Sequence, residues 1–122
     1  MSRNVLTVIG VGGMGQAIAR RLGSGKTVVL ADNNADTLAS VAESLAAEGH
    51  DVRSRGVDVC AAESVHDLAQ YAATLGAVTQ LAHTAGLSPT QASAQAILAV
   101  DLVAVALVLQ EFGAVIAPGA RV

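Results

Sequence analysis

The chain has 122 residues, which is enough for one domain with a single hydrophobic core. Hydrophobic residues make up 52% of it and charged residues only 14%, a composition that argues against a disordered chain. A net charge of −3, with one tyrosine, one phenylalanine and no tryptophan, argues against nucleic-acid binding, which needs basic surfaces or aromatic stacking.

Cysteine content and the start of the chain bear on its compartment. The single cysteine, Cys60, excludes an internal disulfide, and the sequence clusters no ligands for a metal site. The first residues lead directly into a predicted strand without a secretory signal, which favours a cytoplasmic protein. The most apolar stretch, residues 96–109, is interrupted by Asp101 and falls short of the roughly 20 residues that cross a bilayer, so no membrane span is predicted.

Predicted strands and helices alternate along the chain. Strands are predicted at residues 4–9, 26–31, within 51–59 and at 77–82, and a fifth begins at residue 120 after a turn at 117–119. Helices are predicted at residues 16–22, between 36 and 49, at 65–75 and at about 91–112. This alternation indicates βαβ units, a parallel sheet and right-handed crossovers, hence an α/β fold.

The glycine cluster after the first strand is the strongest functional signal. Gly10, Gly12 and Gly15 fit the G-x-G-x-x-G spacing of a dinucleotide-binding turn, with Gly13 and Met14 inside it. The first glycine permits a tight turn, the second lets a pyrophosphate approach the backbone, and the third lets the helix pack on the strand. The N–H groups at the helix start would then face the phosphates. An ordinary strand-to-helix loop is the alternative.

Asp32 favours NAD over NADP as the cofactor. It lies 22 residues after Gly10 at the predicted end of the second strand, where an acidic residue hydrogen-bonds the ribose 2′-hydroxyl. A 2′-phosphate would bring negative charge against this carboxylate, and the next residues, Asn33 and Asn34, supply no compensating cation. The alternative for Asp32 is a helix N-cap.

Two further candidate site segments lie at the ends of the third and fourth predicted strands. Asp58 is predicted to end the third strand in the run Val57-Asp58-Val59, where its carboxylate can accept a hydrogen bond from an adenine amino group. The alternative for Asp58 is a cap of the next helix. The loop His83-Thr84-Ala85-Gly86 follows the fourth strand.

Together with the glycine turn, these two segments resemble the motifs of the short-chain dehydrogenase/reductase family in their order and spacing. The resemblance covers essentially the whole chain but only the first half of the family's domain. It implies that Asp58 and Val59 contact adenine and that Ala85 and Gly86 support the central strand beside the cofactor. Asp101 stands where the family's long helix carries a catalytic-tetrad asparagine. That helix, residues 91–112, is similar to the one in the family's oligomer interface, so a homo-oligomer is expected.

The sequence departs from the family in its glycine turn, loop and chemistry. Only two residues separate Gly10 from Gly13, where the family usually has three, and His83-Thr84 replaces an asparagine pair. The family's serine and its tyrosine with lysine four residues on, a proton relay, are missing. The only tyrosine, Tyr71, is followed four places later by Leu75, and the only lysine is Lys26. We therefore expect no catalytic residue in this chain, and inactivity on its own.

The sequence thus predicts one NAD-binding domain over residues 1–122. Its expected fold is a Rossmann-like doubly wound parallel sheet of about four strands plus the start of a fifth, truncated relative to the family. The expected role is the cofactor-binding portion of an NAD-dependent oxidoreductase that acts on a carbonyl or alcohol group. Two alternatives are a non-enzymatic NAD-sensing regulatory domain and a β-hydroxyacid dehydrogenase-type cofactor domain, whose G-x-G-x-M-G turn the stretch from Gly10 to Gly15 also resembles.

Overall fold

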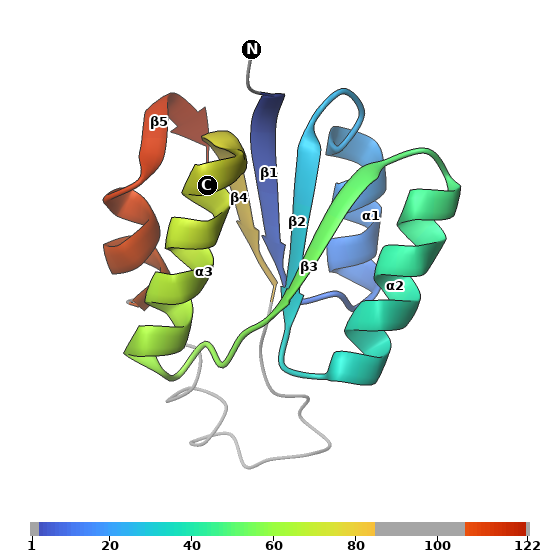
Figure 1. Cartoon of the computed structure of the whole chain (residues 1–122), viewed down its shortest axis with the longest axis horizontal. Helices are drawn as coiled ribbons and strands as arrows, with labels where there is room; N and C mark the ends of the chain where they lie inside the picture. The colour runs from blue at the N-terminus through green and yellow to red at the C-terminus, as the bar shows by residue number, and fades with distance from the viewer. Residues whose placement is uncertain (1–2, 85–106, 122) are drawn as a thin grey trace.

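A parallel β-sheet with helices on both faces makes up the molecule (Figure 1). The computed structural model describes residues 3–84 and 107–121. Its elements are β1 (Arg3–Ile9), α1 (Gly13–Leu22), β2 (Thr27–Asp32), α2 (Ala35–Ala47), β3 (Asp51–Gly56), α3 (Ala62–Leu75), β4 (Gly76–His83), a helical segment at residues 107–113 and β5 (Ile116–Arg121). The sheet order is β3-β2-β1-β4-β5, and all of the pairings are parallel, which confirms the predicted doubly wound Rossmann-like fold.

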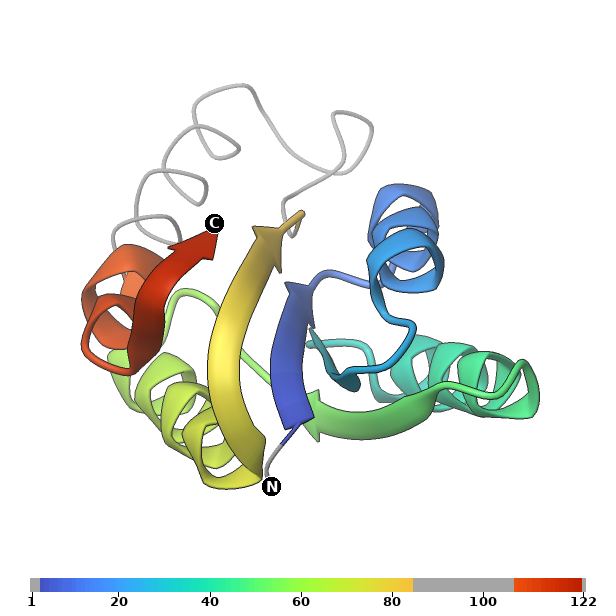
Figure 2. The ribbon, with the colours of Figure 1, turned by 90° about the horizontal axis from the view of Figure 1, so that it is seen from above.

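The two faces of the sheet are covered by different helices. Seen from above, α1 and α2 lie on one side of the strands, and α3 and the helical segment 107–113 lie on the other (Figure 2). Successive side chains of the central strand β1 enter opposite cores, since Val5 and Ile9 join the α3 side while Leu6 and Val8 join the α1–α2 side. Burial on both faces explains the apolar stretches of β1 from Val5 to Ile9, interrupted only by the buried Thr7, and of β2 from Val28 to Ala31.

The third strand ends earlier than predicted, and this moves Asp58 off the sheet. β3 pairs with β2 residue by residue until Gly56 lies opposite Asp32, which is the last residue of β2. The Val57 N–H then donates to the Asp32 carbonyl at 3.1 Å, where β2 itself ends. The prediction that the run from Val57 to Val59 ends the strand was therefore wrong.

The first helix and the fourth strand are longer than predicted. α1 begins at Gly13 rather than at residue 16, inside the glycine cluster. β4 starts at Gly76, predicted only as a helix stop, and includes His83, predicted in the following loop, because β1 offers partners from Arg3 to Ile9.

The last strand contains the predicted turn at residues 117–119. β5 runs from Ile116 to Arg121 and pairs with β4 at only two positions, Ile116 opposite Val78 and Arg121 opposite Gln80. Pro118 has no N–H for a ladder, and it is tolerated here because β5 is the edge strand of the described sheet.

Of the long helix predicted at residues 91–112, residues 91–106 lie outside the described residues. Residues 107–113 are helical, and Val108 and Phe112 are buried against α3. The oligomer interface on this helix stays a prediction. In the part of the chain that is described, no helix combines the length and apolarity needed to cross a bilayer.

One polar contact ties this helical segment to α3. His66 Nδ1 on α3 donates to Glu111 Oε2 at 2.8 Å. This hydrogen bond, chiefly, and the charges of Glu111 and Asp67 raise the pKa of His66 above its ordinary value of 6.5, against a smaller opposing effect of desolvation.

The His66–Glu111 contact predicts a pH-dependent stability. Because the pKa of His66 is raised in the folded state, its contribution is fully present below pH 6.5 and is lost as the pH rises through the raised value. Glu111→Gln should lower the pKa of His66 in an NMR titration and flatten the dependence of the urea midpoint on pH above 6.5. The exposed Glu43→Gln, on α2, should do neither. An unchanged His66 titration in Glu111→Gln would contradict the assignment.

Candidate functional site

The glycine turn connects the end of β1 to the start of α1. Gly10 has a φ of 97°, which favours glycine, and its N–H donates to the Ala31 carbonyl of β2 at 2.8 Å. A Cβ on Gly15 would lie 1.9 Å from the Gly10 carbonyl oxygen, so α1 can approach β1 this closely only without a side chain there. The first and third glycines of the motif thus have the packing roles that their spacing predicts.

The middle of the turn is open. A Cβ added at Gly12 or Gly13 would meet no atom within 4 Å among the described residues. Packing within the described part of the chain therefore does not require glycine at these two positions. Open space beside the backbone at Gly12 fits the close approach of a ligand, as the motif predicts.

The start of α1 offers unpaired backbone donors. Gly12 is the N-cap in an extended conformation, and the first intrahelical bond runs from the Gln16 N–H to its carbonyl at 3.0 Å. No side chain in the described part of the chain caps this helix, and its first turn contains no acidic residue. The N–H groups and the helix dipole thus favour an anion here.

Asp32 lies at the carboxyl end of β2, as predicted, and faces the glycine turn. Its Oδ2 accepts from the Val11 N–H at 2.9 Å, and its Oδ1 accepts from the Asn34 N–H at 2.9 Å. The α2 N-cap is Asn34, whose side chain accepts from the Thr37 N–H at 3.0 Å, so the alternative role of Asp32 as the N-cap was wrong. Asn33 is exposed between Asp32 and Asn34.

Asp58 and Val59 lie in the connection from β3 to α3. Asp58 is exposed, its N–H donates to Ser64 Oγ at 2.9 Å, and its Oδ1 accepts from the Cys60 N–H at 3.0 Å. Val59 is partly buried against the core on the α3 side. Asp58 thus organises the turn before α3, and its predicted contact with adenine stays a prediction.

Thr84, which the sequence analysis named in the loop after the fourth strand but not among the cofactor-binding residues, contacts the glycine turn. Its N–H donates to the Ile9 carbonyl at 2.7 Å, and its hydroxyl lies 3.1 Å from that oxygen and 2.9 Å from the Gly10 carbonyl oxygen. Thr84 therefore joins the end of β4 to the glycine turn, at the position where the resembled family has an asparagine. Its position in the loop directly after the predicted fourth strand was the one signal in the sequence.

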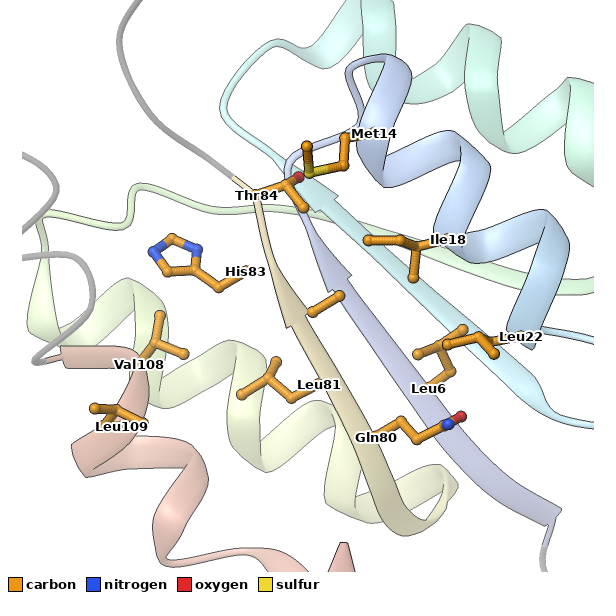
Figure 3. Close-up of a pocket in the computed structure, with 11 residues that line it drawn as sticks. Leu6, Met14, Ile18, Leu22, Gln80, Leu81, His83, Thr84, Val108 and Leu109 are labelled. Atoms are coloured by element: carbon orange, nitrogen blue, oxygen red, sulfur yellow. The ribbon is translucent and has the colours of Figure 1, made fainter. Parts of the chain in front are cut away.

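An apolar cavity of about 610 Å³ opens beside the glycine turn. Figure 3 shows Met14, Ile18 and Leu22, spaced four residues apart on α1, along one side of it. Val108 and Leu109 lie on the other side of β4 from these helix residues, and the His83 ring points toward these two residues (Figure 3). Thr84 borders the end of the cavity near the turn, and Gln80 the opposite end. Asp32 and Asp58 do not line it.

Several other residues considered from the sequence are not at the glycine turn. Three of them lie outside the described residues: Ala85, Gly86 and Asp101. Lys26 lies before β2, at the opposite end of the sheet from the glycine turn, and its Nζ donates to the Leu22 carbonyl at 2.7 Å. Tyr71 lies on α3 with the Arg55 guanidinium 3.8 Å from its ring centre. Among the described residues, no group of three His, Cys, Asp or Glu could hold a metal ion.

The family described as short chain dehydrogenase matches residues 4–115, so the chain belongs to the short-chain dehydrogenase/reductase family. The chain is 39% identical over 119 residues to the short-chain dehydrogenase/reductase bsc3 of Alternaria brassicicola. That match covers 98% of this chain but 43% of the relative.

Solved structures of the family have the same fold. A short-chain dehydrogenase/reductase from Burkholderia phymatum in complex with NAD superposes with a TM-score of 0.81 at 28% identity, over 94% of this chain and 44% of that one. A metagenomic short-chain oxidoreductase in complex with NADP superposes with a TM-score of 0.79 at 31% identity, over 94% of this chain and 57% of that one. A short-chain dehydrogenase/reductase from Serratia marcescens superposes with a TM-score of 0.82 at 26% identity, over 97% of this chain and 53% of that one. The chain thus spans about half the length of these relatives.

The glycines of the turn should respond differently to substitution. Gly15→Ala should lower the free energy of unfolding by about 1–3 kcal/mol, because its methyl group would overlap the Gly10 carbonyl. Gly12→Ala should cost about 1 kcal/mol at most, since alanine is only a poorer N-cap, but should weaken nucleotide binding at least about tenfold. Urea unfolding and calorimetric titration with NAD measure the two effects. Equal losses of stability in both variants would contradict the packing role of Gly15.

Proposed function

We propose that this chain binds NAD as the cofactor-binding portion of a short-chain dehydrogenase/reductase. The observation that carries the proposal is the open backbone at Gly12 and Gly13, beside uncapped N–H groups of α1 and the Asp32 carboxylate. A pyrophosphate on the helix start would satisfy donors that the described side chains leave unpaired. The Asp32 carboxylate would accept from the ribose hydroxyl at the adenosine end.

The preference for NAD over NADP rests on charge. A 2′-phosphate would approach the Asp32 carboxylate, and like charges about 4 Å apart at an effective dielectric of 20 repel by about 4 kcal/mol per unit charge. The neighbouring side chains are the uncharged Asn33 and Asn34, which do not offset this repulsion. Salt reduces it, so a preference of at least about tenfold, or about 1.4 kcal/mol, is expected.

The apolar cavity supports binding of the rest of the dinucleotide. It begins at Met14 and Thr84, directly beside the glycine turn, and its walls are mainly apolar. A dinucleotide with its pyrophosphate on the turn would extend its second half into this space. His83, Thr84 and Gln80 supply the polar groups that could orient it.

The full-length enzyme would transfer a hydride between NAD and a carbonyl or alcohol carbon, chemistry that the bound nicotinamide supplies. This chain would contribute binding and orientation. Its only tyrosine, on α3, contacts Arg55 of β3 through its ring, and its only lysine lies at the opposite end of the sheet from the turn. Neither is positioned to exchange a proton with a substrate beside the glycine turn.

Titration calorimetry of the 122-residue chain with NAD and with NADP tests the proposal. NAD should bind at least about tenfold more tightly, with the difference shrinking as salt is raised. No NAD-dependent alcohol oxidation should be detectable in the same preparation. Equal affinities would contradict the cofactor preference, and measurable oxidation would contradict the inactivity of this chain. A protease-resistant dimer whose shape changes with NAD would favour the sensor alternative.

A further inference from the structure

Both oxygens of the Asp32 carboxylate already accept hydrogen bonds from the backbone of two different turns. The Val11 N–H belongs to the glycine turn, and the Asn34 N–H belongs to the turn before α2; each donates at 2.9 Å. Val11 is fully buried, so its N–H depends on an acceptor within the protein. Asp32, which is predicted to hydrogen-bond the ribose of the cofactor, thus also holds the glycine turn that would bind the phosphates.

The first two residues of the glycine turn are held by the protein at every backbone polar group. Besides the Val11 N–H, the Gly10 N–H donates to Ala31, the Gly10 carbonyl accepts from Thr84 Oγ1, and the Val11 carbonyl accepts from Gln16 Nε2 at 2.9 Å. The N–H groups from Gly13 onward begin α1 and have no such side-chain partners among the described residues. The turn is therefore divided into an anchored part, residues 10–11, and an open part that can receive phosphate.

We propose that Asp32 is a positioning residue that fastens the anchored part of the glycine turn, in addition to facing the ribose. This inference rests on the proposed function. Because both oxygens are held by N–H groups, the carboxylate cannot rotate away from a 2′-phosphate without releasing Val11 or Asn34. Replacing Asp32 to admit NADP would remove the repulsion and loosen the phosphate-binding turn together. Substitution at this position alone should therefore weaken NAD binding, while the loosened turn offsets the gain that NADP would have from the lost repulsion.

Two nucleotides separate positioning from recognition of the hydroxyl. ADP carries the ribose 2′-hydroxyl and 2′-deoxy-ADP lacks it, while both carry the same diphosphate. If Asp32 positions the turn, Asp32→Ala should weaken binding of both nucleotides by similar factors, at least tenfold, in NMR titrations. Asp32→Asn keeps one acceptor oxygen and should weaken both less. Glu43→Ala removes the same charge from the exposed face of α2 and serves as the matched control.

Hydrogen exchange of the Val11 amide without nucleotide gives a second measurement. It should accelerate at least tenfold in Asp32→Ala, less in Asp32→Asn and not at all in Glu43→Ala, while amides of β2 stay protected. If Asp32→Ala unfolds, Asp32→Asn carries the comparison. Unchanged Val11 exchange, with loss of affinity for ADP only, would overturn the positioning role. Failure of the wild-type protein to bind any nucleotide would refute the proposed function. In that case, hydrogen exchange of the Val11 amide would still test whether Asp32 positions the glycine turn.

Discussion

The close approach of α1 to the end of β1 is the constraint on which the candidate site depends. The carbonyl of Gly10 occupies the space that a side chain at position 15 would need. This contact sets where the helix begins, and so where its first N–H groups lie relative to the carboxyl ends of the strands. The hydroxyl of Thr84, directly after β4, donates to the same carbonyl at 2.9 Å. A parallel sheet with β1 at its centre is what brings these groups together.

Charge at the site is distributed between backbone and side chain. The helix start supplies partial positive charge without any lysine or arginine in the turn, and Asp32 supplies a full negative charge a short distance away. A ligand that satisfies both must carry an anionic group and a neutral hydrogen-bond donor with a matching separation. The proposed ligand, NAD, would offer both, a pyrophosphate and an unphosphorylated ribose.

Local patterns predicted the features that depend on local chemistry. The glycine spacing, the apolar runs of β1 and β2, and the position of Asp32 at a strand end all follow from neighbours in sequence, and the parallel fold followed from their alternation. The errors arose where a distant partner decides. β3 stops because β2 ends opposite it, and Pro118 fits in a strand because β5 lies at the edge of the described sheet. The bonds of Asp32 to Val11 and of Thr84 to Gly10 could not be foreseen, because they join turns that the sheet brings together.

The register of the sheet also implies an order of folding. Val5 pairs with Thr27 on one side and with Val78 on the other, so the second pairing closes a loop about three times as long. The longer closure costs about 1 kcal/mol more in chain entropy, and during synthesis β4 leaves the ribosome well after β1 to β3. The β1-β2-β3 unit, with the Asp32 contact to the glycine turn, can therefore form first. The hydrogen bonds of Thr84 to Ile9 and Gly10 need β4 in place beside β1, so in this order the anchored part of the turn would be completed after its contact with Asp32.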